Sequence, residues 1–382
     1  MAEFLEFIEN WDGYRPVPQQ RLSEAAMAKV VDLLNNTEGH PIHRHRYLLQ
    51  EAVTTSDFPV LFGGVLDRQM LAIYKSAPSP WRSYVPTGTL ADFRVATLHK
   101  VQGNQQLLAR VPEKTEYPIS PMVEASYNRQ LFKRGRMFDI SWEAIVNDAM
   151  DAFGDMPTRF ANAALYTESF LATSIYAAAA GPNPLLFGAP IADVDGQNVT
   201  NLGVLPLTIL NLETTINLMA QQTDVQGRPL GISAVHLVVP PALQFVARAI
   251  LTSAFKQHVD TAGAANAAAS TFIPLPTTNV IPQVGLQLHV DKLLPVIDTT
   301  LPNSTWYLFA DASEGRWGQL DFLRGHESPE ICMKASNKVS LTGQLLDPFG
   351  GDFDSDDILW RVRHVLGGSQ LDPRFAYAQT GP

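Results

Sequence analysis

The residues with the clearest metal-binding potential are three histidines near the N-terminus. His40, His43 and His45 stand two or three positions apart in the string HPIHRHR, a spacing at which imidazoles converge on a transition metal if the backbone is irregular. Arg44 and Arg46 stand among them and repel a cation, and no acidic or thiol ligand lies directly beside them. The pattern therefore favours a solvated basic arm, and we assign no metal ligand to it.

An acidic run near the C-terminus has the alternating carboxylates with which a calcium loop begins. The run consists of Asp352, Asp354, Asp356 and Asp357. A calcium loop needs glycine at its sixth position and a bidentate glutamate at its twelfth. Here Asp357 and Arg363 occupy those positions, so we expect a hydrated turn held by its own aspartates.

Other residues give no better support for catalysis. His236 stands in the apolar string AVHLVV, which predicts a buried histidine hydrogen-bonded to backbone in preference to a general base. The single Cys332 excludes an intramolecular disulfide and a dithiol redox pair. The chain has no phosphate-binding loop, dinucleotide fingerprint, HExxH or GxSxG motif. We therefore expect no enzymatic activity, no cofactor and no bound metal.

Composition sets the class of protein. The 382 residues include 28 Lys and Arg against 38 Asp and Glu, for a formal net charge of −10. Such a balance argues against a surface that binds nucleic acid everywhere, because phosphate binding needs clustered cations. Hydrophobic residues make up 46%, enough for a real core, and the length favours two or three lobes. No run of about eighteen apolar residues and no basic leader is present, so we expect a soluble protein in a reducing cytoplasm.

The first third of the chain predicts an arm, a helix and a long hairpin. A helix is expected near Leu22–Leu34 within a polar arm, and another from Thr54, with Met70 and Ile73 on its apolar face. Three segments rich in β-formers follow and are expected to form one extended hairpin: FRVATLHKV, QQLLARV and EASYNRQLFKRGRMFDI.

This hairpin is highly charged, so it has little apolar surface for a core of its own. We expect it to lie against a neighbouring subunit, in a head-to-tail contact where opposite charges meet. The alternative for the basic residues is contact with nucleic acid. The predicted interface residues are Glu113, Glu116, Glu124, Arg129, Lys133, Arg134 and Arg136.

The remainder predicts a long helix, an α/β lobe and returning strands. The helix should start at Asp155, with Pro157 in its first turn, and end at Gly181. From about Leu205 the pattern predicts a helix at ILNLETTINLM, the strand AVHLVVP, a second helix with Leu243, Val246, Ile250 and Ala254 on its apolar face, and the strands QLHV and TWYLFAD. The small residues of TAGAANAAAS at 261–270 predict a loop between them. Strands are expected at RWGQLDFLR, PEICMKA and DILWRVRHVL, and the last of them should have one solvent-exposed face.

Several strings resemble those of the major head proteins of tailed bacteriophages, with the Hong Kong 97 (HK97-like) capsid fold, and most of all the Mu-like prophage head subunit group. They are TTSDFPVLFGGVLDRQML, VPEKTEYP, FKRGRMFDISWEAIVNDAMDAF, LVVPPALQFVARAIL and RVRHVLGGSQLDPRFAYAQTG, and they span residues 54 to 380. Before residue 50 no string is similar to that family.

The resemblance implies an α+β fold with an N-terminal arm, an extended β-hairpin (the E-loop), a peripheral domain with a long spine helix, and an α/β axial domain. The implied boundaries are 1–53 for the arm, 54–92, 138–204 and 321–382 for the peripheral domain, 93–137 for the E-loop and 205–320 for the axial domain. An axial loop containing Gly263, Ala264 and Asn266 would lie near the axis of each capsomer.

The resemblance also implies the function of a major capsid protein. Many copies would assemble, as pentamers and hexamers, into an icosahedral phage head around double-stranded DNA, in the bacterial cytoplasm. A scaffolding protein, a portal and a decoration protein are the further partners that it implies, and no membrane is involved. The alternatives are an encapsulin-like nanocompartment shell of the same fold and a soluble α/β enzyme or binding protein.

Overall fold

The computed structural model describes residues 70–77, 79–103, 110–117, 122–141, 150–258, 275–334, 337–338 and 352–381. The chain divides into two compact units. The larger comprises Asp67–Met137, Asp155–Ile331 and Arg361–Pro382, and the smaller Met1–Leu66, Phe138–Gly154 and Cys332–Trp360. The predicted arm, its helix and the loop at 261–270 lie outside the described residues.

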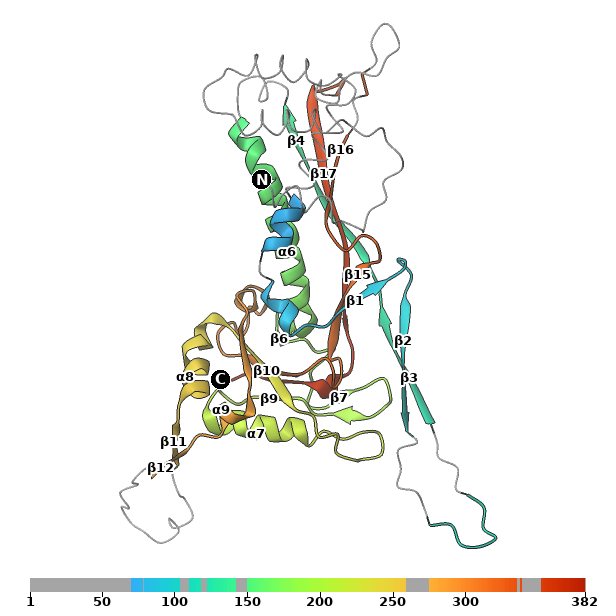
Figure 1. Cartoon of the computed structure of the whole chain (residues 1–382), viewed down its shortest axis with the longest axis vertical. Helices are drawn as coiled ribbons and strands as arrows, with labels where there is room; N and C mark the ends of the chain where they lie inside the picture. The colour runs from blue at the N-terminus through green and yellow to red at the C-terminus, as the bar shows by residue number, and fades with distance from the viewer. Residues whose placement is uncertain are drawn as a thin grey trace, which may run out of the picture. The chain divides into compact units, whose positions relative to one another are not determined.

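Runs of strands separate the helices along the described chain, and the longest elements are the helix α6 and the strand β17 (Figure 1). The strands are β1 (Thr87–Leu90), β2 (Ala96–Gly103), β3 (Met122–Arg129), β4 (Phe132–Ser141), β5 (Ala177–Ala178), β6 (Gly181–Pro182), β7 (Ile191–Ala192), β8 (Asn198–Val199), β9 (Leu202–Gly203), β10 (Ala234–Val239), β11 (Phe255–His258), β12 (Leu275–Thr278), β13 (Gln287–Val290), β14 (Trp306–Ala310), β15 (Gly318–Leu323), β16 (Glu330–Met333), β17 (Asp357–Gln370) and β18 (Ala376–Gln379). The helices are η1 (Pro80–Ser83), α6 (Met150–Tyr176), α7 (Ile209–Ala220), η2 (Pro241–Leu243), α8 (Gln244–Thr252), α9 (Ile281–Val284), α10 (Leu294–Ile297) and η5 (Pro373–Phe375), and residues 70–76 are also helical.

One five-stranded sheet of the larger unit is buried on both faces. Its order is β13-β10-β14-β18-β9, with parallel and antiparallel pairs. In β14 the side chains of Trp306 and Leu308 pack against α7 and α8, whereas Tyr307 and Phe309 face the opposite way. Because neighbouring residues of a strand point to opposite faces, the continuous apolar string WYLFA fits this position.

Three helices cover one face of this sheet. Leu212 and Met219 of α7, Ile250 of α8 and Ile281 of α9 lie in the same apolar cluster as the strands. The helix α7 begins where the hydroxyl of Thr208 accepts the Asn211 amide, as an N-cap residue does. The predicted α/β alternation from residue 205 to 310 is confirmed, although the second helix ends at Thr252 and Ala254 lies outside it.

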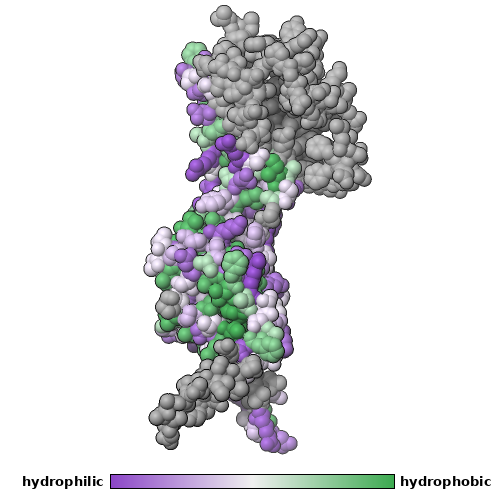
Figure 2. Space-filling model, turned by 90° about the vertical axis from the view of Figure 1, so that its left-hand side faces the viewer, coloured by the Kyte–Doolittle hydropathy of each residue, from purple (hydrophilic) through white to green (hydrophobic). Residues whose placement is uncertain are grey.

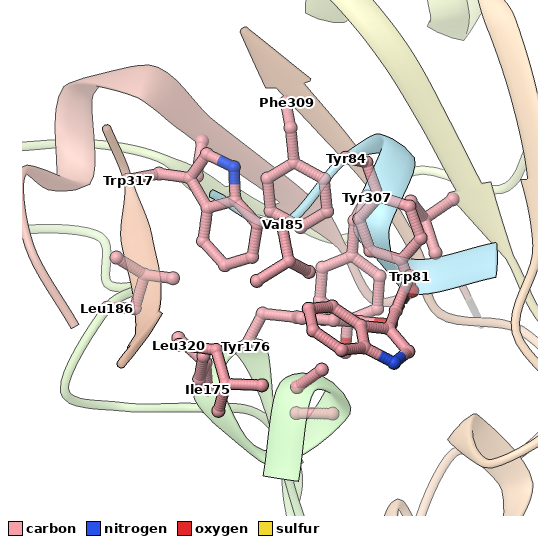
Figure 3. Packing of buried hydrophobic residues seen from close by; sticks show 14 of the residues in the cluster. Trp81, Tyr84, Val85, Ile175, Tyr176, Leu186, Tyr307, Phe309, Trp317 and Leu320 are labelled. Atoms are coloured by element: carbon pink, nitrogen blue, oxygen red, sulfur yellow. Dashed lines mark hydrogen bonds between the residues drawn. The ribbon is translucent and has the colours of Figure 1, made fainter. Parts of the chain in front are cut away.

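The opposite face of the sheet packs against the end of α6 and a second sheet. That sheet has the order β1-β15-β17-β16, and β4 also pairs with β17. An aromatic cluster joins the two sheets within the larger unit (Figure 3). The rings of Phe309 and Trp317 stack with their centroids 4.0 Å apart, and Tyr176 meets both Tyr307 and Phe309 edge to face.

The helix α6 differs from the prediction at both ends. It includes Gly154, Asp155 and Pro157, so it begins before Asp155, where the sequence predicted its start. Pro157 therefore lies inside the helix, where proline removes one backbone hydrogen bond and crowds the preceding turn. The helix ends at Tyr176, five residues before Gly181. Its last turn is closed by Asn183, whose side-chain amide donates to the carbonyls of Ser174 and Ile175.

The hairpin contains fewer residues than the sequence predicts. The strands β2 and β3 pair in eight consecutive registers, from Ala96 opposite Arg129 to Gly103 opposite Met122. The expected continuous strand from 124 to 140 breaks at Gln130 and Leu131, because Leu131 turns into an apolar cluster with Leu90 and Val365. Beyond the break the chain forms β4, which pairs with β17 and not with β2. Of the predicted strand QQLLARV, only Arg110 and Val111 are described, and they are not in a strand.

The smaller unit contains the acidic turn. Asp352 accepts a hydrogen bond from the Lys334 ammonium at 2.9 Å, and the backbone amide of Asp356 bonds to the Asp352 carbonyl. Lys338 pairs with Asp356. The predicted turn is present at 352–357, where the Asp352 carboxylate accepts the Phe353 amide at 3.0 Å, but the lysine contacts of Asp352 and Asp356 were not predicted.

The predicted mixed α+β class is confirmed. The strand β17 has the predicted solvent-exposed face, with Ile358 and Trp360 buried and Arg361 exposed. The strand β18, however, lies in the sheet with β10 and β14, so the last residues of the chain return to the α/β lobe.

Candidate functional site

The base of the hairpin has one face against its own chain and one face exposed. On the inner face Ala125 and Tyr127 are buried and Lys100 is half-buried. The outer face consists of exposed residues: Thr97, His99, Glu124, Ser126 and Asn128. The alternation follows from the two-residue period of a strand.

Beneath the inner face lies a buried cluster of charged side chains. Arg374, 1% exposed, donates to Asp193 at 2.6 Å and to Asp195 at 2.8 Å, and its backbone amide donates to Asp372 at 3.1 Å. The hairpin contributes Lys100, which pairs with Asp372 and lies 3.7 Å from Asp193, and Tyr127, whose hydroxyl donates to Asp193 at 2.8 Å.

Burial shapes the electrostatics of this cluster. It raises the pKa of the Asp193 carboxyl, and neighbouring Asp372 raises it further, while Tyr127 and Lys100 act in the opposite direction. Burial also raises the pKa of the Tyr127 hydroxyl, so this group stays a hydrogen-bond donor. For Arg374, burial lowers the pKa of the guanidinium, but the three aspartates outweigh it and the net pKa is raised. The arginine is therefore a permanent cation among carboxylates.

A second contact ties the hairpin to the sheet. Arg129 donates to Asp321 at 3.1 Å, and Gln319 donates to the same carboxylate oxygen at 2.6 Å. Burial raises the pKa of Asp321, against the effect of Arg129. The expectation that the hairpin finds its burial on a neighbouring subunit is thus wrong for its base, which packs on its own chain through polar side chains.

The outer part of the hairpin keeps no such contacts among the described residues. Residues 112–117 are exposed, and Tyr117 retains 83% of its surface. Glu113 and Glu116 lie here, and Glu124 lies on the exposed face of β3. None of the three glutamates has an ion-pair partner in the described part of the chain.

The basic residues lie on a different element from the one predicted. Lys133, Arg134 and Arg136 belong to β4, which pairs with β17 and is no part of the hairpin. Every residue from 132 to 137 is exposed, including the apolar Phe132 and Met137. Within the described residues these three cations have no carboxylate partner, and they are referred to below as the basic strand.

Sequence reasoning missed an exposed apolar surface beside α8. The residues that form it are Phe245, Val246, Phe255, Val280 and Val284. Asn279 joins their elements, since its side-chain amide donates to the carbonyls of Ile250 and Ser253. Figure 2 shows the side of the molecule on which α8 and α9 lie in Figure 1, and apolar residues gather there. The sequence contains no signal of this surface, because its pattern placed Val246 on the buried face of the helix, whereas Val246 is exposed in the structure.

The remaining candidates for chemistry serve the fold. His236 is buried as predicted, but its ring nitrogen Nδ1 lies 3.1 Å from Nε2 of His289 and not against backbone. No group of three or more His, Cys, Asp or Glu side chains suited to a metal is found in the described ranges. None of the helices described there is long and apolar enough to cross a membrane. His40, His43 and His45 and the axial-loop residues Gly263, Ala264 and Asn266 lie outside the described residues.

These features define a structural protein that works through exposed surfaces: an α+β body carrying a charged hairpin and a basic strand. The family model described as phage capsid protein matches residues 125–379, about two thirds of the chain. The chain belongs to this family. It is a phage major capsid protein, a non-enzymatic virion component that assembles with copies of itself into the shell of the head.

Solved structures similar to this chain include examples from two phages and a bacterium. One is the capsid of the cyanophage P-SCSP1u, with 10% identity, a TM-score of 0.45, and coverage of 78% of this chain and 86% of that chain. Another is from Microbacterium phage Oxtober96, with 9% identity, a TM-score of 0.44, and coverage of 80% and 92%. A third is a phage-related protein from Bordetella bronchiseptica, with 10% identity, a TM-score of 0.43, and coverage of 83% and 95%. Comparison with the curated proteins gives no match.

Proposed function

We propose that this capsid protein has the HK97-like arrangement and builds an icosahedral head of pentamers and hexamers around double-stranded DNA, in the manner of the Mu-like head subunits. The sheet β13-β10-β14-β18-β9 with α7, α8 and α9 corresponds to the axial domain. The sheet containing β1, β15 and β17, with α6 as spine helix, corresponds to the peripheral domain. The hairpin β2–β3 corresponds to the extended loop.

The observation that carries the proposal is that exposed glutamates of the hairpin and exposed cations of the basic strand have no ion-pair partner within the described chain. The hairpin presents Glu113, Glu116 and Glu124 beside the exposed cations Arg110 and Lys114, and the basic strand presents Lys133, Arg134 and Arg136. We infer that the hairpin of one subunit lies on the basic strand of the next, with Phe132 and Met137 supplying apolar contact. Such a contact joins two different surfaces, so it propagates head to tail and closes into rings. Arg129 does not join it here, because Asp321 holds it within its own chain.

The net charge is compatible with DNA as the proposed cargo. A chain with a formal charge of −10 forms a wall that does not bind packaged DNA strongly over its whole inner surface. A scaffolding protein, a portal and a decoration protein complete the proposed set of partners, and assembly takes place in the bacterial cytoplasm.

Charge reversal tests the contact. The triple variant Lys133→Glu, Arg134→Glu, Arg136→Glu should remain folded, because all three side chains are exposed, and should fail to form closed shells. Adding Glu113→Lys and Glu116→Lys should restore them by recreating the charge pairs in reverse. Sedimentation and electron microscopy of the expressed protein provide the readout.

A control separates this contact from general charge effects. Lys292→Glu with Arg324→Glu also reverses exposed cations, outside the basic strand, and should leave assembly intact. If the triple variant assembles like the wild type, or if the compensating variant restores nothing, the proposed pairing is wrong. Nuclease-resistant DNA in particles from phage-infected cells would support the cargo, and particles filled with protein would point to a nanocompartment.

Deleting residues 102–118 tests the hairpin itself. The eight-pair ladder loses its distal end and the described glutamates Glu113 and Glu116, whereas the two sheets of the body keep all their strands. We expect a folded subunit, with an unchanged far-ultraviolet spectrum, that forms no shells. Closed particles from the deletion variant would overturn the interface assignment.

A further inference from the structure

The two chain segments that lead into the hairpin leave the body from one small apolar cluster. Leu90, at the end of β1, and Leu131, which follows β3, are both buried and pack with Val365 of β17. Residues 91–95, between Leu90 and β2, are all exposed. The hairpin is therefore attached at two adjacent points, as an arm is attached at a pivot.

Away from this pivot, three side chains hold the hairpin on the body. Lys100 pairs with Asp372 and lies near Asp193, Tyr127 donates to Asp193, and Arg129 donates to Asp321. All three lie on the inner face of the ribbon. Among the residues of this face whose burial is described, the apolar contribution comes from Ala125 and the ring of Tyr127, which are buried, and from Ala96 and Leu98, which are partly buried.

Each carboxylate of the body keeps a second partner that does not belong to the hairpin. Asp193 accepts from Arg374 at 2.6 Å, Asp372 from the Arg374 amide at 3.1 Å, and Asp321 from Gln319 at 2.6 Å. The β2–β3 ladder is also complete without the body. Separation of the hairpin would thus release Lys100, Tyr127 and Arg129 from the body and leave neither the ribbon nor the carboxylates without hydrogen bonds.

We propose that the hairpin is a latched arm: it turns as a rigid ribbon about Leu90 and Leu131, and Lys100, Tyr127 and Arg129 form a polar latch that holds it on its own subunit until a neighbour engages it. The proposal rests on the proposed function, because the latch has a use only if the outer part of the hairpin lies on another copy. A polar latch suits this role, because water can hydrogen-bond the groups that the arm exposes when it lifts, whereas the separation of an apolar seal would expose apolar surface to water.

The latch is tested in the full-length, unassembled subunit. Spin labels on Ser126→Cys, on the outer face of β3, and Thr252→Cys, on exposed α8, report the hairpin-to-body distance in a Cys332→Ser background. The latch variant Lys100→Met with Tyr127→Phe removes two contacts without adding bulk. We expect one narrow distance distribution with the latch intact and, in the variant, a broad second population raised by about tenfold, as two lost hydrogen bonds imply.

Two further variants show whether the inner-face contacts are what holds the hairpin. His99→Ala, on the outer face of β2, should leave the distance distribution narrow. Lys100→Arg, which keeps the positive charge, should also give the narrow distribution of the wild type. A latch variant with the narrow distribution of the wild type would overturn the latch, even if its shells still form. A broad distribution in the His99→Ala control would also overturn it, because the inner-face contacts would then not be what holds the hairpin. Both readouts are independent of assembly, so a failed charge-reversal experiment leaves them valid.

Discussion

At the scale of single residues, the larger unit depends on buried charges that are paired almost completely. Arg374 joins Asp193 and Asp195 and also donates to the carbonyl of Thr223. On α6, Glu168 is fully buried and accepts hydrogen bonds from Tyr74, Arg82 and His364. Removing one partner from such a group costs far more than the pair itself contributes, because the other charge stays buried.

Arg374→Met should therefore destabilise the subunit strongly. The loss of the cation removes the guanidinium that Asp193 and Asp195 share, and we expect about 3–5 kcal/mol less free energy of unfolding because these carboxylates stay buried. Urea denaturation of the unassembled protein measures it. The exposed Arg248→Met on α8 is the matched control and should change the value by no more than about 0.5 kcal/mol. Equal stabilities of the two variants would contradict this account of the cluster.

The histidine pair predicts an acid-sensitive subunit. Burial lowers the pKa of His236, and burial together with His236 lowers the pKa of His289 to about 4. Between the ordinary histidine pKa of about 6.5 and this value the unfolded chain binds more protons, so stability falls as the pH falls.

Replacing His289 isolates this contribution. His289→Gln should flatten the decline of the melting temperature between pH 6.5 and 4.5 relative to the wild type, because the variant has no proton to exclude at that position. Thermal unfolding across this pH range gives the comparison. Parallel curves for the two proteins would show that the pair does not couple folding to pH.

At the scale of elements, local pattern and tertiary contact each decide part of the outcome. The strands AVHLVV, QLHV and WYLFA and the helix ILNLETTINLMA follow from apolar spacing alone. The break at Leu131 and the pairing of β4 with β17 did not, because the string from 124 to 140 has uniform β-propensity. Its partners are chosen by residues more than two hundred positions away.

A glycine marks the place where these distant segments meet. A Cβ atom on Gly367 would lie 1.9 Å from the carbonyl oxygen of Gln130, so Gly367→Ala forces the backbone apart at the start of β4. We expect a loss of about 1–3 kcal/mol, as for other overpacked sites, and faster amide exchange in β4. Ser313→Ala, in an exposed turn, provides the baseline. An alanine variant with wild-type exchange in β4 would contradict this pairing.

At the scale of the whole molecule, the sequence predicted the class of protein more successfully than it predicted which residues contact one another. The absence of catalytic motifs, the acidic balance and the resemblance to phage head proteins led to a capsid subunit, and the family match confirms it. The salt bridges at the hairpin base could not be anticipated. Lys100, Asp193 and Asp372 are separated by up to 272 positions, and one sequence contains no signal that pairs them. The apolar surface at Phe245 was equally hidden, since a patch emerges only when separate elements meet.

The position of the hairpin tip in an assembled particle tests the central claim most directly. Electron cryomicroscopy of shells formed by the purified chain, at a resolution that traces β4 and residues 110–117, would show where Glu113 and Glu116 lie. The account predicts that they lie within ion-pair distance of Lys133, Arg134 or Arg136 of an adjacent subunit. Tips folded back on their own subunit, with the basic strand facing solvent in every copy, would contradict it.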